Sequence, residues 1–132
     1  MDRLFLDANV LFSAAYRPDA RLLRIWNLKN VVLCSSRYAL AEASVNLEDE
    51  VQRKRLAQLA EKLQLFEAPP RQLPRGISLP EKDVPILLAA IAARATHLLT
   101  GDVRDFAPYF GKKIEGVMIV LPAEYLRVAL SS

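Results

Sequence analysis

The sequence predicts an α/β fold with a mostly parallel central sheet that is covered by helices on both faces. Short continuous apolar runs occur near residues 4, 31, 97 and 117, which is typical of strands that are buried on both sides. Segments with apolar residues at helical spacing lie between these runs, and alternation of strands with helices favours a parallel sheet. Since 132 residues suit one compact domain, we expect a single domain over residues 1–132.

The first strand is expected at Arg3–Leu6, followed by a sharp turn at Asp7 and a helix. That helix should stop near Arg17, because Pro18 disfavours helical backbone in the residue before it. A second helix is predicted over Ala20–Leu28, where most of the apolar side chains fall on one side. The chain therefore begins with one strand and two helices.

The next buried strand is predicted at Val31–Cys34. Ser35 or Ser36 can cap the helix that follows, which we expect to run through Asn46. A long amphipathic helix is then predicted over Glu48–Phe66, with acidic residues at its start that suit the helix dipole. This part of the chain is therefore expected to hold the second strand and two further helices.

Proline and glycine are concentrated in Ala68–Pro80, which is expected to be a surface loop with room for a short strand. A helix opens at Glu81–Pro85, since proline suits the first helical turn. The last two strands are predicted at His97–Thr100 and Val117–Val120, and the last helix at Leu121–Leu130. A buried strand thus again precedes a polar turn at residues 100–106.

Composition excludes several classes of protein. The longest apolar run, Val84–Ala93, is broken by Pro85 and is far shorter than the roughly 20 residues of a membrane span. Acidic residues stand where a signal peptide would be basic or apolar, and the lone Cys34 is expected to be a buried thiol. We therefore expect a cytoplasmic protein with no membrane partner. The net charge of +3 permits a polyanionic partner.

Four carboxylates are the candidate site. Asp7 and Asp102 each follow a predicted strand, so in a parallel sheet they should meet at the edge where strands end. Glu42 stands on a mostly apolar helical stripe and Asp83 at a helix start, and both can reach that edge. Asp7 and Asp83 also suit helix caps, a purely structural alternative.

Carboxylates that are crowded together repel one another unless they are protonated or neutralised. Mg²⁺ and Mn²⁺ favour such oxygen ligands, whereas the sequence offers no cluster of cysteine and histidine for zinc. It also has no phosphate-binding glycine loop or dinucleotide fingerprint. An acidic metal site on a mildly basic protein suits chemistry on a phosphate ester.

The order and spacing of these motifs resemble a PIN domain over essentially the whole chain, and particularly the single-domain toxin ribonucleases of VapC-type toxin–antitoxin modules. The motifs are residues 6–11, Glu42, Asp83 with the apolar helix after it, and residues 98–102 with Phe106. The resemblance implies a three-layer α/β/α domain, a metal-dependent endoribonuclease that cleaves RNA with Mg²⁺ or Mn²⁺, a homodimer, and a cognate antitoxin whose peptide occupies the groove.

Carried over by position, the resemblance implies that the catalytic and metal-binding acids are Asp7, Glu42, Asp83 and Asp102. Asn9 and Thr100 match polar positions that orient the site, and Asp105 is an additional candidate acid. Between Asp102 and Asp105 we favour Asp102, because it follows the strand directly and Gly101 before it allows a tight turn.

Two rival functions remain open at this point. A haloacid-dehalogenase-like phosphatase also has an aspartate after its first strand, and Gly101, Asp102 and Asp105 resemble its last motif. It fits less well, because Asn9 stands where that family has a second aspartate and 132 residues leave little room for the complete fold. The other rival is a non-catalytic PIN-like module that binds RNA or protein. The presence of all four acids argues against a decayed site.

Overall fold

The computed structural model describes residues 1–131, and in them one sheet has the strand order β3-β2-β1-β4-β6-β5. Neighbouring strands pair in parallel, except that β5 and β6 are antiparallel. The α/β class with a mostly parallel sheet is therefore confirmed. The strands are β1 (Asp2–Leu6), β2 (Val31–Ser35), β3 (Gln64–Leu65), β4 (His97–Leu99), β5 (Lys113–Ile114) and β6 (Val117–Val120).

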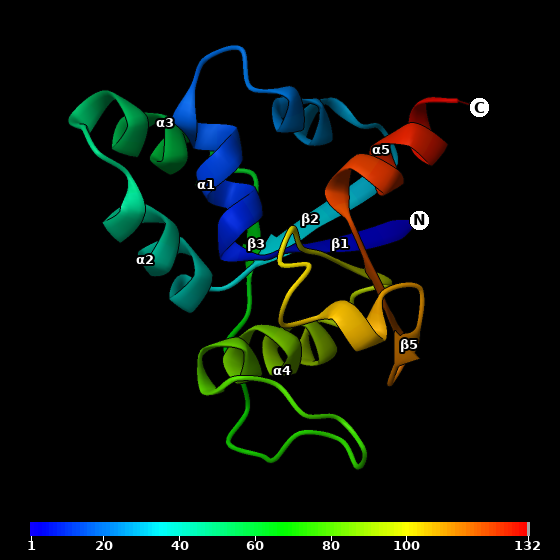
Figure 1. Cartoon of the computed structure of the whole chain (residues 1–132). Coiled ribbons are helices and arrows are strands. Elements are labelled where there is room, and N and C mark those ends of the chain that lie inside the picture. The colour runs from blue at the N-terminus through cyan, green and yellow to red at the C-terminus, as the bar shows by residue number, and fades with distance from the viewer. Residues whose placement is uncertain (132) are drawn as a thin grey trace.

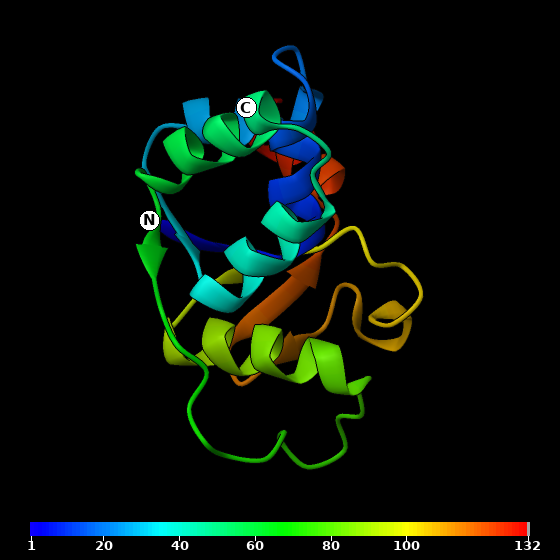
Figure 2. The same ribbon diagram turned by 90° about the vertical axis from the view of Figure 1, so that its left-hand side faces the viewer.

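Helices cover both faces of the sheet and make three layers (Figures 1 and 2). One face carries α1 (Ala8–Tyr16), the 3₁₀ helix η1 (Arg21–Asn27), α2 (Arg37–Asn46), α3 (Glu50–Ala60) and α5 (Pro122–Leu130). The other face carries α4 (Val84–Ala92), which follows the short 3₁₀ turn η2 (Glu81–Asp83). A last 3₁₀ turn, η3, spans Ala107–Tyr109. None of the helices within residues 1–131 is long and apolar enough to cross a membrane.

The centre of the core is β1, which lies between β2 and β4. Its residues Leu4, Phe5 and Leu6 are fully buried, as expected for a strand that is covered on both faces. The register places Leu6 beside Leu99, the last residue of β4. The polar residues that follow these two strands therefore lie side by side at one edge of the sheet.

The predicted long helix over Glu48–Phe66 is wrong at its C-terminal end. Helix α3 ends at Ala60, and Gln64–Leu65 instead forms β3, which pairs with β2. The free edge of β2 explains the difference, because its backbone groups take hydrogen bonds from an extended segment. The Phe66 amide, for example, donates to the Ser35 carbonyl at 2.9 Å.

The predicted helix over Ala20–Leu28 is a 3₁₀ helix, η1, in the structure. Residues three apart lie directly above one another in a 3₁₀ helix, whereas in an α-helix they are offset by about 60° around the axis. The apolar residues of this segment have that spacing, so the tighter winding turns them together toward the core. The pairs are Leu22 with Ile25 and Leu23 with Trp26.

Candidate metal centre

Two polar residues meet where β1 and β4 end. The Asp7 amide donates to the Leu99 carbonyl at 3.1 Å, and the Thr100 hydroxyl donates to Asp7 Oδ2 at 2.8 Å. Asp7 Oδ1 also accepts from the Ala8 amide at 2.6 Å, as the N-cap of α1. Asp7 therefore caps a helix with one oxygen while its other oxygen faces β4.

Asp7 is 3% exposed, and burial raises the pKa of its carboxyl, against hydrogen bonds from Thr100 and Ala8 that lower it. Asn9 orients this corner, since its Nδ2 donates to Asp7 Oδ2 at 3.3 Å and its Oδ1 accepts from the Gly101 amide at 2.8 Å. A Cβ atom on Gly101 would lie 3.3 Å from Asn9 Oδ1, so glycine allows this close approach.

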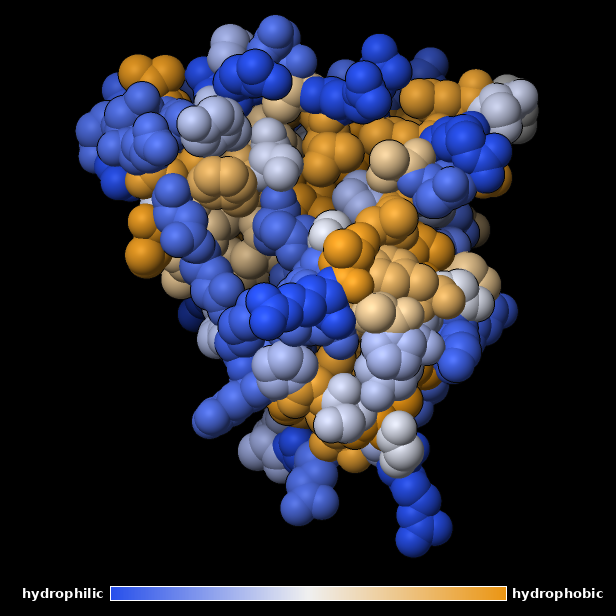
Figure 3. Space-filling view, in the orientation of Figure 1, coloured by the Kyte–Doolittle hydropathy of each residue, from blue (hydrophilic) through white to orange (hydrophobic). Residues whose placement is uncertain are grey.

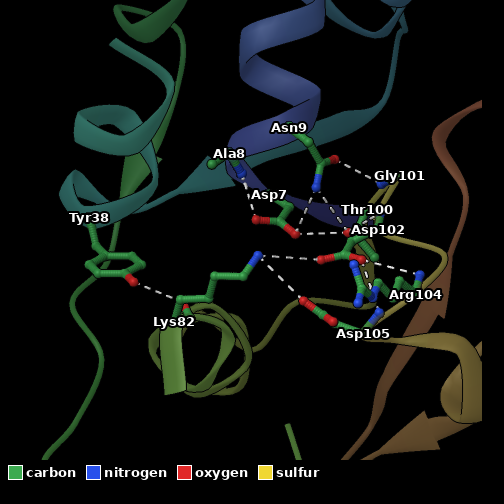
Figure 4. A network of polar contacts seen from close by, with 10 residues as sticks. All are labelled: Asp7, Ala8, Asn9, Tyr38, Lys82, Thr100, Gly101, Asp102, Arg104 and Asp105. Atoms are coloured by element: carbon green, nitrogen blue, oxygen red, sulfur yellow. Dashed lines mark hydrogen bonds and ion pairs between the residues drawn. The ribbon is translucent and has the colours of Figure 1, made fainter. Parts of the chain in front are cut away.

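The loop after β4 turns tightly around the Asp102 side chain (Figure 4). Asp102 Oδ1 accepts from the backbone amides of Arg104 at 3.2 Å and Asp105 at 2.9 Å, and the Asp102 amide donates to Thr100 Oγ1 at 3.1 Å. Such local bonds from an aspartate to the backbone stabilise a turn. The turn brings Asp105 back toward the strand ends, beside Asp102.

Asp83 faces this loop from the start of α4. It is 5% exposed, it makes no capping hydrogen bond, and its Oδ2 is buried with no hydrogen-bond partner in the described part of the chain. Burial raises the pKa of Asp83 from its ordinary 3.8 to about 7, and the nearby Asp105 acts in the same direction. A buried polar atom without a partner is costly and calls for a bound ion or another group.

Three carboxylates come together here, because Asp83, Asp102 and Asp105 each offer an oxygen within 4.8 Å of the other two. The contact with Asp83 in turn lowers the pKa of Asp105. Lys82 is the counter-ion, with Nζ 3.4 Å from Asp105 Oδ2 and 3.8 Å from Asp102 Oδ2. The cluster therefore holds more negative than positive charge.

A pocket of about 460 Å³ opens beside the cluster and is lined by all four acids that the sequence singled out, Asp7, Glu42, Asp83 and Asp102. Glu42 enters it from α2, where it is half-buried. Asp105 stands outside this lining but inside the three-carboxylate cluster. Both Asp102 and Asp105 lie beside Asp83, so the preference for Asp102 over Asp105 stays a prediction.

Sequence reasoning missed two residues of the site, Tyr38 and Lys82. The Tyr38 hydroxyl donates to the Lys82 carbonyl at 2.8 Å and so ties α2 to η2 across the pocket (Figure 4). Burial and Glu42 raise the pKa of Tyr38 to about 12, so the phenol keeps the proton that it donates. Their positions in the sequence could have pointed to them, because Tyr38 lies one helical turn before Glu42 and Lys82 lies directly before Asp83.

The residues fit a divalent cation of the Mg²⁺ or Mn²⁺ type. The unpartnered Asp83 oxygen and the close oxygens of Asp102 and Asp105 form an all-oxygen donor set, which these ions prefer. The chain's histidine, His97, lies at the other end of β4, where Nδ1 contacts Thr96 Oγ1 at 2.8 Å and the ring packs on Tyr125. A zinc site is therefore not favoured here.

Comparison with known families agrees with this geometry. The sequence profile of the PIN domain family matches residues 3–104, which include six of the seven predicted site residues and end one residue before Asp105. None of the curated proteins compared with the chain matches it. Members of the family are generally metal-dependent nucleases that bind RNA. The match covers most of the chain, and the fold and the acidic strand-end pocket agree with it, so the chain belongs to the PIN domain family.

Proposed function

We propose that the protein is an endoribonuclease that cleaves RNA phosphodiester bonds with Mg²⁺ or Mn²⁺. The observation that carries the proposal is the buried, unpartnered oxygen of Asp83 inside a cluster of three carboxylates, beside the pocket at the strand ends. A bound divalent ion would satisfy that oxygen and neutralise the cluster. No other described group satisfies it.

Asp83, Asp102 and Asp105 would hold the ion, which when bound lowers the pKa of a coordinated water and stabilises charge on the phosphate. Thr100 and Asn9 fix the Asp7 carboxylate against rotation through hydrogen bonds of 2.8 and 3.3 Å. Positioning groups of this kind contribute by holding reactants in a productive geometry.

Glu42 lines the same pocket from α2. A half-buried carboxylate in this place can accept a proton from the attacking water. Asp7 and Glu42 would thus act on water and substrate in the pocket, while the three-carboxylate cluster carries the ion.

Positive side chains near the pocket support RNA as the substrate. Phe12 lines both the acidic pocket and a second hollow that also contains Arg17 and Arg21. Arg21 in turn lines a third hollow together with Arg24 and Arg127. The top of Figure 3, where residues 17–24 run, is mostly hydrophilic with hydrophobic side chains beneath it. The second hollow also contains Tyr16, which is exposed, and arginines beside an exposed aromatic ring suit a single-stranded nucleic acid.

The experiment that tests this proposal incubates the purified protein with a circular single-stranded RNA and a structured RNA. We expect cleavage of the circle, which has no ends, with Mg²⁺ or Mn²⁺, and no cleavage in EDTA. The Asp7→Asn variant should lose most of the activity, because the proposal places this carboxylate beside the reacting water.

Three outcomes would count against the proposal. Cleavage that survives EDTA or Asp7→Asn would contradict the mechanism. Hydrolysis of small phosphomonoesters without RNA cleavage would favour a phosphatase. Binding of RNA without cleavage, under any divalent ion, would favour a non-catalytic module.

The toxin role, the cognate antitoxin and the homodimer are finer parts of the proposal, supported by the resemblance to VapC-type toxins. A toxin should arrest growth on expression, and co-expression of a small neighbouring gene product should relieve the arrest. Light scattering on the purified protein should give the mass of a dimer, about twice 14.8 kDa. Unimpaired growth with an active nuclease would remove the toxin role alone.

A further inference from the structure

Lys82 is a cation at the centre of an acidic site. Of the described residues that line the acidic pocket, it is the only one with a positive charge. Its ammonium group lies 3.4 Å from Asp105 Oδ2 and 3.8 Å from Asp102 Oδ2. Lys82 therefore neutralises part of the charge that a metal ion would neutralise.

The backbone of Lys82 is fixed while its ammonium group is free to move. The Tyr38 hydroxyl holds the Lys82 carbonyl at 2.8 Å, and the side chain extends from that contact toward the two carboxylates (Figure 4). The side chain of Lys82 is 63% exposed, against 17% for Asp102 and 15% for Asp105. The acids are thus held in place, whereas the ammonium group can leave for water at little cost.

The ammonium group and a divalent ion would compete for the same two carboxylates. Asp102 and Asp105, which pair with Lys82, are two of the three carboxylates whose oxygens lie within 4.8 Å of one another. Two cations a few ångströms apart repel each other strongly when little water separates them. Occupancy by the ion therefore opposes pairing with Lys82.

We propose that Lys82 is an internal counter-ion, which holds Asp102 and Asp105 beside Asp83 until a divalent ion displaces its ammonium group. The inference rests on the proposed metal site. Lys82 is then a positioning residue, because it keeps together carboxylates that would otherwise repel. It also sets the ion concentration at which the site fills, since each ion must first displace it.

Binding of Mn²⁺ to the full chain tests this inference without any measurement of activity. Free Mn²⁺ is followed by electron paramagnetic resonance during titration of the wild type, Lys82→Met and Lys82→Arg. We expect Lys82→Met to bind Mn²⁺ roughly two- to fivefold more tightly, because the variant has no ammonium group that competes with the ion. This range corresponds to the usual free energy of an exposed ion pair. Lys82→Arg keeps the charge and should bind like the wild type.

Lys54→Met is the matched control, since it removes the same charge from an exposed position on α3, away from the pocket. Equal tightening in Lys54→Met and Lys82→Met, or unchanged or weaker binding in Lys82→Met, would overturn the inference. Mn²⁺ binding by the wild type without tightening in Lys82→Met would leave the proposed metal site intact. Absence of Mn²⁺ binding by the wild type would overturn both.

Discussion

Replacement of Asp83 by asparagine is expected to abolish divalent ion binding and RNA cleavage while it stabilises the metal-free protein. The carboxylate is buried and one of its oxygens lacks a partner, so its charge opposes folding. An asparagine amide can instead donate to the neighbouring acids. Cleavage should fall on the order of a thousandfold, since a bound ion contributes several kcal/mol to the transition state.

Chemical denaturation without metal at pH 8 and cleavage assays on the same preparation measure both effects. We expect a gain of roughly 1–4 kcal/mol in the free energy of unfolding, because a buried unsatisfied group costs about 1–3 kcal/mol and a charged one costs more. Asp19→Asn is the control, because Asp19 is 83% exposed and pairs only loosely with Arg17. Retained metal-dependent cleavage in Asp83→Asn, or a loss of stability, would refute this account of Asp83.

The stability gain from Asp83→Asn is expected to depend on pH, from near zero at pH 4 to its full value above pH 7. The pKa of Asp83 is about 7 in the folded protein and ordinarily 3.8, so the folded state retains a proton that the unfolded state has lost. Between these values unfolding releases a proton. The free energy of unfolding of the wild type therefore falls as pH rises, by at most about 1.4 kcal/mol per pH unit for one group.

The difference between variant and wild type isolates this effect from other titrating groups. Burial lowers the pKa of His97 from its ordinary value of 6.5. Below pH 6.5 this makes the free energy of unfolding rise with pH, which is opposite to the effect of Asp83. His97 is present in both proteins, so its contribution cancels in the difference. Asp105, whose pKa is lowered by Asp83, contributes only at more acidic pH. Denaturation curves from pH 4 to 8 give the measurement, and a gain that is constant across this range would contradict the raised pKa.

The four acids that line the pocket could be predicted from their combined order and spacing, because Asp7 and Asp83 taken alone also suit helix caps. Asp7 and Asp102 directly follow buried strands, and the parallel sheet brings strand ends together. Glu42 lies at helical spacing from Tyr38 and Ala39, and Asp83 stands at a helix start. The alternation of strands and helices and the spacing of helical residues are regular, so the sequence is enough to predict them.

Other parts of the structure depend on contacts that leave no periodic pattern of residues in the sequence. Asp105 joins the cluster because amides in its loop bond to the Asp102 side chain, and turns of this kind are set residue by residue. Strands β3 and β5 have two residues each, which is too short for an alternating pattern. The long flexible side chain of Lys82 can reach many partners, so adjacency alone did not single out its contacts with the acids.

The most direct test of the central claim is the position of a bound ion. A crystal of the protein grown with Mn²⁺ should give an anomalous difference peak between the carboxylates of Asp83, Asp102 and Asp105, with Asp83 Oδ2 among the ligands. The Lys82 ammonium group should lie away from that peak. No peak at saturating Mn²⁺, or a peak only at surface acids away from the pocket, would contradict a divalent ion centre at the ends of β1 and β4.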